Sequence, residues 1–141
     1  MTRPPSGVLA KLMEQHAALR DMIASCVRLA DELDRGRGEA SELSAHTAAL
    51  RIAFEAHNRY EEQFLRPVLA ETDGFAEVRI DRMIADHVDE HRLVGSELAS
   101  PITRELRTTL DHLRRHLDAE ERYFLSSRVL RDDLVVVESG G

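Results

Sequence analysis

Residues 57–61 read His-Asn-Arg-Tyr-Glu, which places His57 and Glu61 four positions apart and therefore on one face of a helix. That face continues in both directions as an apolar stripe with steps of three and four residues, formed by Leu43, His46, Leu50, Ala53, His57, Glu61, Phe64 and Val68. An unpaired carboxylate in an apolar core costs several kcal/mol, a large share of a small domain's stability of roughly 5–15 kcal/mol. Either Glu61 is neutral, or a cation lies beside it.

The same periodicity predicts three further amphipathic helices, and with them an all-α fold, an up-down-up-down antiparallel four-helix bundle. The first helix has its apolar stripe from Leu9 to Leu33, with Ser6 as a candidate N-cap. The second runs from about Ser41 to Leu69, with Pro67 near its end, and the third from about Phe75 to Ala99. The fourth starts at Ser100-Pro101 and has its stripe as far as Phe124. We expect residues 1–125 to form the bundle and residues 126–141 to form a C-terminal tail, whose structure the sequence does not define.

Composition limits the function classes. A formal net charge of −7 argues against nucleic acid and against an anionic membrane surface as partners, since both require clustered Lys and Arg. The single cysteine, Cys26, excludes an internal disulfide and fits a reducing compartment. Because the N-terminus lacks the apolar run of a signal peptide and no stretch has the ~20 apolar residues of a membrane span, we expect a cytoplasmic protein. The oligomeric state is not predicted.

The histidines are the unusual feature of the chain. Counting the rise of ~1.5 Å per residue along antiparallel helices puts the inward-facing histidines and acids at one level, in a layer roughly two or three turns thick. This layer comprises His16, His57, Glu61, His87, His91, His116 and Glu120. It holds too many nitrogen donors for one zinc ion, which is satisfied by four ligands, and it suits a pair of iron or manganese ions. The alternative is a metal-free core in which these groups bond to one another.

Two other histidines fit this layer less well. His46 lies three turns from His57, towards the far end of its helix, and we interpret it as a hydrogen-bonded interior or rim residue. His112 precedes His116 by one turn and borders the same face, so we expect it to lie at the rim or to support a ligand.

The ordered motif of His16, His57-xxx-Glu61, His87-xxx-His91 and His116 followed by an acid resembles the hemerythrin family, also called HHE cation-binding domains. The resemblance spans about residues 8–125 and implies a non-haem di-iron centre. It implies that His87, His91 and His116 hold one iron and that His16 and His57 hold the other. Glu61 and an acid of the last helix would bridge the two irons, with an oxo or hydroxo group as a third bridge.

The bridging acid of the last helix is the point of departure from oxygen-carrying hemerythrins. These proteins use an aspartate five residues after the last histidine, whereas this chain has Glu120 four residues and Glu121 five residues after His116. Symmetry with His57 and Glu61 favours Glu120.

Two functions remain open after this resemblance, and a third reading is a metal-free or merely metal-stabilised interaction bundle. The resemblance implies an open iron position that binds dioxygen, or another small diatomic or peroxide ligand, for storage, delivery or sensing. The alternative is an oxidoreductase that uses the same centre on peroxide or nitric oxide, or in iron-centre repair. Chemistry of the ferritin-like type is disfavoured, because the Glu-x-x-His motif of those bundles does not occur in this sequence.

Overall fold

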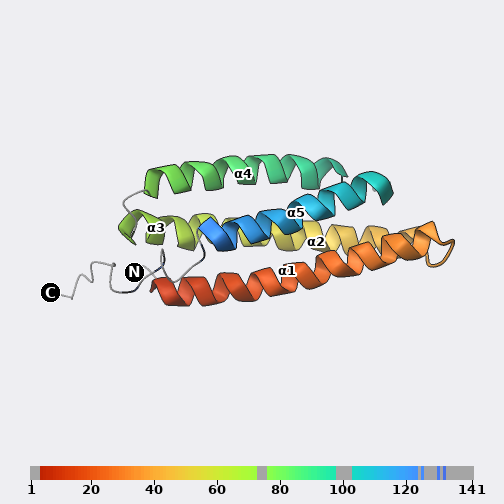
Figure 1. The fold of residues 1–141 in the computed structure, drawn as a ribbon, viewed down its shortest axis with the longest axis horizontal. Helices are drawn as coiled ribbons and strands as arrows, with labels where there is room; N and C mark the ends of the chain where they lie inside the picture. Colours follow the sequence, from red (N-terminus) through yellow and green to blue (C-terminus); the bar gives the residue numbers. More distant parts are fainter. Residues whose placement is uncertain are drawn as a thin grey trace.

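The structure is a computed structural model that describes residues 4–72, 76–97 and 103–123 and the single positions 125, 130 and 132. Its elements are α1 (Pro5–Asp34), α2 (Ala40–Tyr60), a π-helical segment η1 (Glu61–Leu65), α3 (Arg66–Thr72), α4 (Ala76–Glu97) and α5 (Thr103–Tyr123). The long helices lie side by side and alternate in direction (Figure 1), which confirms the all-α antiparallel bundle.

The first helix ends where the sequence predicts. Gly36 and Gly38 both have a φ of 73°, a left-handed conformation that favours glycine, and they turn the chain from α1 into α2. The predicted cap at Ser6 is wrong, because α1 already begins at Pro5. The backbone N–H of Ser6 instead donates to Asp132 Oδ1 over 2.9 Å, so the segment after α5 returns to the start of α1.

The second rod of the bundle is continuous from α2 through η1 to α3 but changes its winding at Glu61. The wider π turn ends at Leu65, two residues before Pro67, which has no N–H for the carbonyl of residue 63. Leu65 is buried, whereas Phe64, which the sequence placed in the stripe, is half-buried and packs on Tyr60 with ring centroids 4.6 Å apart. Val68, the next residue of the predicted stripe, is buried as expected.

The hydrophobic core is divided into two clusters. One contains Leu19, Ile23, Cys26, Leu29, Ala30, Leu43, Leu50, Phe54, Leu106, Leu110, Leu113 and Leu117. The other contains Val8, Leu12, Leu65, Val68, Leu69, Met83, Leu125 and Leu130. Between them each rod carries buried polar residues, of which His16 on α1 and Glu120 on α5 are examples. A layer of polar groups therefore crosses the interior of the bundle, as the sequence predicts.

Several expectations fall outside the described residues. These are the start of the fourth helix at Ser100-Pro101, the side chain of Phe124 and most of the tail at 126–141. Leu125 and Leu130, which are described, are buried in the second cluster, so the core includes at least these positions beyond α5. Within the described part of the chain, no helix combines the length and the apolar character needed to cross a membrane.

Candidate metal centre

The polar layer is built first from two histidines on neighbouring helices. His16 of α1 is fully buried between Leu12 and Leu19, and His57 of α2 is 2 % exposed. Their rings meet edge to face with centroids 4.8 Å apart. Phe54, one turn before His57, packs against the His57 ring at 6.2 Å and an interplanar angle of 84°. This packing orients both imidazoles towards the centre of the bundle.

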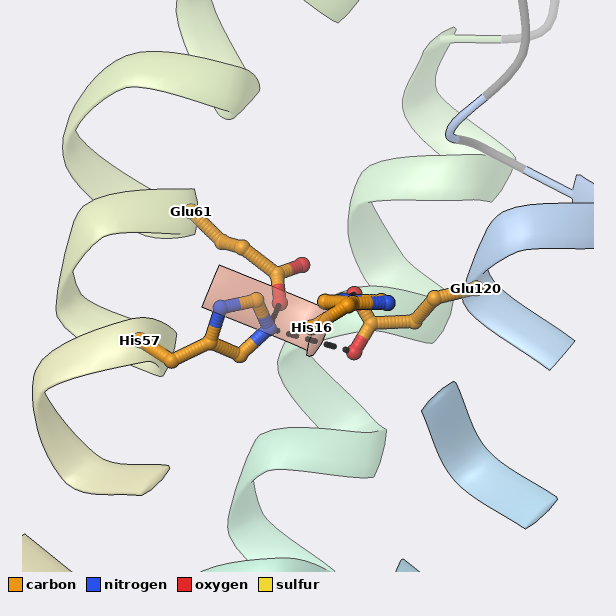
Figure 2. A group of neighbouring side chains, drawn as sticks. All are labelled: His16, His57, Glu61 and Glu120. Atoms are coloured by element: carbon orange, nitrogen blue, oxygen red, sulfur yellow. Dashed lines mark ion pairs between the residues drawn. The ribbon is translucent and has the colours of Figure 1, made fainter. Parts of the chain in front are cut away.

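Two glutamates meet these histidines from η1 and α5. Glu61 is fully buried and Glu120 is 1 % exposed. Glu61 lies against His57 as an i,i+4 ion pair, and Glu120 carboxylate oxygens lie 3.7 Å from His57 Nε2 and 3.8 Å from His16 Nε2. Figure 2 shows the four side chains pointing towards one another. One ligand atom from each lies within 4.8 Å of those of the others, so the group can hold a metal ion.

A second group adjoins the first and shares Glu120 with it. His116 Nε2 lies 2.5 Å from Glu90 Oε1 and 2.5 Å from Glu120 Oε1. Glu90, His116 and Glu120 form a second set that can hold a cation. Because Glu120 belongs to both groups, its carboxylate lies where it can bridge two ions.

His87 completes the layer from α4. It is 6 % exposed, and its Nε2 lies 3.8 Å from Glu61 Oε2. The structure thus brings together His16, His57, Glu61, His87, His116 and Glu120, all of which the sequence assigned to the layer.

The expected inward position of His91 is wrong. Its side chain is 78 % exposed, and its Nδ1 lies 4.0 Å from Glu55 Oε1 at the surface. The buried residue at this level of α4 is Glu90, which is 1 % exposed and which the sequence analysis did not assign. Asn58 donates from Nδ2 to Glu90 Oε2 over 2.8 Å, and this bond leaves Oε1 directed at His116. A carboxylate therefore stands where an imidazole was expected.

The Nδ1 atoms of the inner histidines face away from the centre. His16 Nδ1 bonds to Glu121 Oε2 at 3.2 Å, His57 Nδ1 donates to Gln15 Oε1 at 2.8 Å, and His87 Nδ1 bonds to Glu62 Oε1 at 3.0 Å. Such partners fix the tautomer and orientation of metal-ligating histidines and leave Nε2 for the metal. Glu121, the alternative to Glu120, therefore lies behind His16, where Arg20 also contacts it.

Several donor atoms that face the centre form no hydrogen bond within the described part of the chain. They are Nε2 of His16, His57 and His87, both carboxylate oxygens of Glu61, Oε1 of Glu90 and Oε2 of Glu120. Some of them are in ion-pair contact, His57 Nε2 with Glu61 and Glu90 Oε1 with His116 Nε2. Buried polar atoms that lack a hydrogen bond are costly and rare, and here they are crowded around one centre. This mixture of imidazole and carboxylate donors fits iron or manganese.

In the metal-free chain, protons on the inner histidines compensate the charge of the buried glutamates. Burial lowers the pKa of His57, but Glu61 and Glu120 outweigh it and raise this pKa to about 10. Burial likewise lowers the pKa values of His116 and His87, but nearby glutamates raise them to about 11 and about 9. The free protein is therefore expected to hold these imidazoles as cations at neutral pH.

The two central glutamates differ in their own protonation. Burial, together with the charge of Glu120, raises the pKa of Glu61. Burial also acts to raise the pKa of Glu120, but its hydrogen bond with His116, together with the nearby rings of His16 and His57, holds this pKa well below its usual range. Of the two possibilities raised for Glu61, the adjacent cation is provided in the metal-free chain by the imidazolium of His57.

The remaining histidines lie outside the cluster, as expected. His46 is half-buried, and its Nδ1 donates to the carbonyl of Glu42 over 2.9 Å. His112 is exposed and lines the rim of a cavity of about 250 Å³ between α4 and α5, which reaches His116. A larger cavity, of about 400 Å³, lies between α2–η1 and α4 and reaches His87 and Glu90.

Comparison with known proteins agrees with this geometry. The family model described as Hemerythrin HHE cation binding domain matches residues 8–126. Comparisons with curated proteins and with solved structures found no match.

Proposed function

The chain belongs to the hemerythrin HHE cation-binding family, and from this premise we propose that it is a non-haem di-iron protein that binds dioxygen at an open iron position inside the bundle. In this proposal His16 and His57 hold one iron. His87, Glu90 and His116 hold the other, so that Glu90 has the role that the resemblance gave to His91. Glu61 and Glu120 lie between the two positions and bridge them, as the sharing of Glu120 by both groups supports.

The observation that carries the proposal is that the two nitrogens of each inner imidazole ring have different surroundings. His16, His57 and His87 each have an Nδ1 that is fixed by a neighbouring side chain and an Nε2 that faces the centre without a hydrogen bond among the described residues. A core stabilised by mutual hydrogen bonds would use both nitrogens. A histidine whose Nδ1 is held by a hydrogen bond and whose Nε2 has none is typical of a metal ligand.

The protein's own groups determine what such a centre can do. A pair of ferrous ions, when bound, would supply the electrons that dioxygen binding needs. The apolar clusters above and below the layer shield it from water on those two sides, and low polarity strengthens the electrostatic interactions within it. The larger cavity reaches the layer at His87 and Glu90, so a small ligand can approach on that side.

The test is metal analysis and spectroscopy of protein loaded with ferrous iron under anaerobic conditions. We expect about two irons per chain, and on exposure to air a charge-transfer band that disappears when oxygen is removed. Irreversible oxidation in air would contradict reversible oxygen binding. Fewer than one metal per chain after loading would contradict the metal centre and favour a metal-free interaction bundle.

Glu90 favours a second candidate, an oxidoreductase that acts on peroxide or nitric oxide or takes part in iron-centre repair. A carboxylate in place of an imidazole adds a hard, negatively charged donor, which stabilises the higher charge of ferric iron. Consumption of many equivalents of peroxide or nitric oxide per iron pair would support this candidate, and consumption that stops at one equivalent would reject it.

We also propose a cytoplasmic location, since Cys26 is a buried free thiol, as is common in reducing compartments. Fractionation of cells that produce the protein would test this location.

A further inference from the structure

The larger cavity leads from the surface to the side of the centre that contains Glu90. Its inner part is formed by His87, 6 % exposed, and Glu90, 1 % exposed. His87 Nε2 and Glu90 Oε1 have no hydrogen-bond partner within the described part of the chain. The cavity therefore ends at two buried atoms that can bind a metal, His87 Nε2 and Glu90 Oε1, the second of which is in ion-pair contact with His116 Nε2 at 2.5 Å.

Its mouth carries further donors of the same kind. The side chains of His91, Glu62 and Glu55 are 78 %, 46 % and 40 % exposed and line the opening. His91 Nδ1 and Glu55 Oε1 are 4.0 Å apart, so a small movement can bring both to one ion. Glu62 accepts a hydrogen bond from His87 Nδ1 over 3.0 Å and so connects the mouth to the inner part.

Charge distinguishes this opening from the smaller one. Among the described residues lining the larger cavity, Glu55, Glu62 and Glu90 are opposed by one guanidinium, that of Arg59. The described lining of the smaller cavity has two arginines, Arg82 and Arg115, against two aspartates. A surplus of carboxylates raises the local concentration of cations, so the larger cavity is the more favourable path for a metal ion.

We propose that the larger cavity is the route by which hydrated ferrous iron reaches the centre, and that His91 and Glu55 form a transient loading site at its mouth. This inference rests on the proposed function of the cluster as an iron centre. His91 and Glu55 would hold the hydrated divalent cation first, Glu62 would replace one of its waters, and Glu90 would receive it at the inner end. In this role His91 is an exposed residue that accelerates loading and is absent from the final ligand set.

The test measures how fast ferrous iron binds under anaerobic conditions, using the full chain and its variants His91→Ala and Glu55→Gln. We expect each variant to load about tenfold more slowly, because local attraction of the cation is lost. The final iron content and the spectrum of the loaded centre should equal those of the unchanged protein. The control is His112→Ala, which removes an exposed histidine from the rim of the smaller cavity and should load at the unchanged rate.

Three other results of the loading experiment would overturn a part of this account. Loading of His91→Ala and Glu55→Gln at the unchanged rate would overturn the loading site while leaving the di-iron centre intact. A lower final iron content or an altered spectrum in His91→Ala would also overturn it, since His91 would then be a ligand of the finished centre. Failure of the unchanged protein to bind iron would overturn the proposed function itself.

Discussion

The side-chain amide of Asn58 donates a hydrogen bond to Glu90 Oε2 over 2.8 Å, from α2 to α4. Asn58 directly follows His57 in α2. One of these neighbours is an inner histidine, and the other holds the carboxylate of Glu90 on α4. The bond uses the outer oxygen of Glu90 and leaves the inner oxygen, which lies 2.5 Å from His116 Nε2, facing the centre.

Replacing Asn58 by alanine should therefore weaken metal binding without removing a ligand. Loss of a residue that orients a ligand costs about 10- to 100-fold in affinity. Titration of the metal-free protein with ferrous iron in the presence of a competing chelator measures this effect. The control is His46→Ala, which alters a residue of the same helix outside the cluster, and equal affinities of the two variants would contradict the role assigned to Asn58.

Glu120 and Glu121 are adjacent in sequence but contact opposite sides of the His16 ring. Glu120 Oε2 lies 3.8 Å from His16 Nε2, and Glu121 Oε2 lies 3.2 Å from His16 Nδ1. Glu120→Gln removes the carboxylate that the two groups share. It should abolish binding of one of the two ions, because the two positions are no longer bridged by this residue. Glu121→Gln should still bind two ions, with affinity lower by about 10- to 100-fold. Elemental analysis after loading distinguishes the two variants, and the reverse result would make Glu121 the bridging acid.

Much of this arrangement could be predicted because periodicity determines which helix face is buried. His16, His57 and Glu120 each occupy an apolar stripe at steps of three and four, and the structure places them in the interior. The antiparallel order of the helices then brings these positions to one level. These inferences needed only the helical repeat and short connections.

The exchange of His91 for Glu90 shows the limit of periodicity as a guide to which side chain is buried. Ile80, Met83 and His87 alternate steps of three and four, and strict continuation selects Glu90. The chemical attraction of a His-xxx-His pair favoured His91 instead. A difference of one residue rotates the chosen position by about 100° around a helix of 3.6 residues per turn, enough to exchange an interior side chain for a surface one.

The π turn was not predictable from the stripe. Glu61 and Glu62, the adjacent first residues of this turn, both contact the same centre: Glu61 lies inside the layer, and Glu62 accepts from His87 Nδ1. Helical wheels assume a constant turn, so they give no signal for a local widening. Pro67 marked an irregularity near the end of the helix but did not locate it.

The stability of the metal-free protein should fall as the pH rises above neutral. The pKa values of His57, His87 and His116, about 10, 9 and 11 in the folded chain, lie above the value of about 6.5 that we expect after unfolding. The folded state therefore retains protons that the unfolded state has released. The resulting stabilisation is complete below about pH 6.5 and decreases by at most about 1.4 kcal/mol per pH unit for each histidine as the pH rises towards the folded pKa values.

Urea unfolding at pH 6.5, 8 and 9.5 tests this dependence, with a chelator present to keep the protein metal-free. The iron-loaded protein is the comparison. Since the metal replaces the protons on Nε2, its stability should decline less over the same range. Constant or increasing stability of the metal-free protein from pH 6.5 to 9.5 would contradict the paired imidazolium and carboxylate groups.

The segment beyond α5 should stabilise the start of α1 through Asp132. Pro4, at the N-cap position, has no side-chain acceptor, and Asp132 accepts from the Ser6 N–H at 2.9 Å and from the Ser6 hydroxyl at 2.7 Å. Asp132→Ala should lower the free energy of unfolding by about 1 kcal/mol, the usual effect of losing a side chain that caps a helix. Asp132→Asn keeps an acceptor oxygen and should cost less.

Urea unfolding midpoints measure this effect, and Asp21→Ala is the control because Asp21 is an exposed aspartate in the middle of the same helix. Asp21→Ala should leave the midpoint unchanged or raise it slightly, since alanine is the better helix former. If Asp132→Ala unfolds at the same urea concentration as Asp21→Ala, the bond to Ser6 does not stabilise α1. Burial of Leu125 and Leu130 in the core would then be what fixes the returning segment to the bundle.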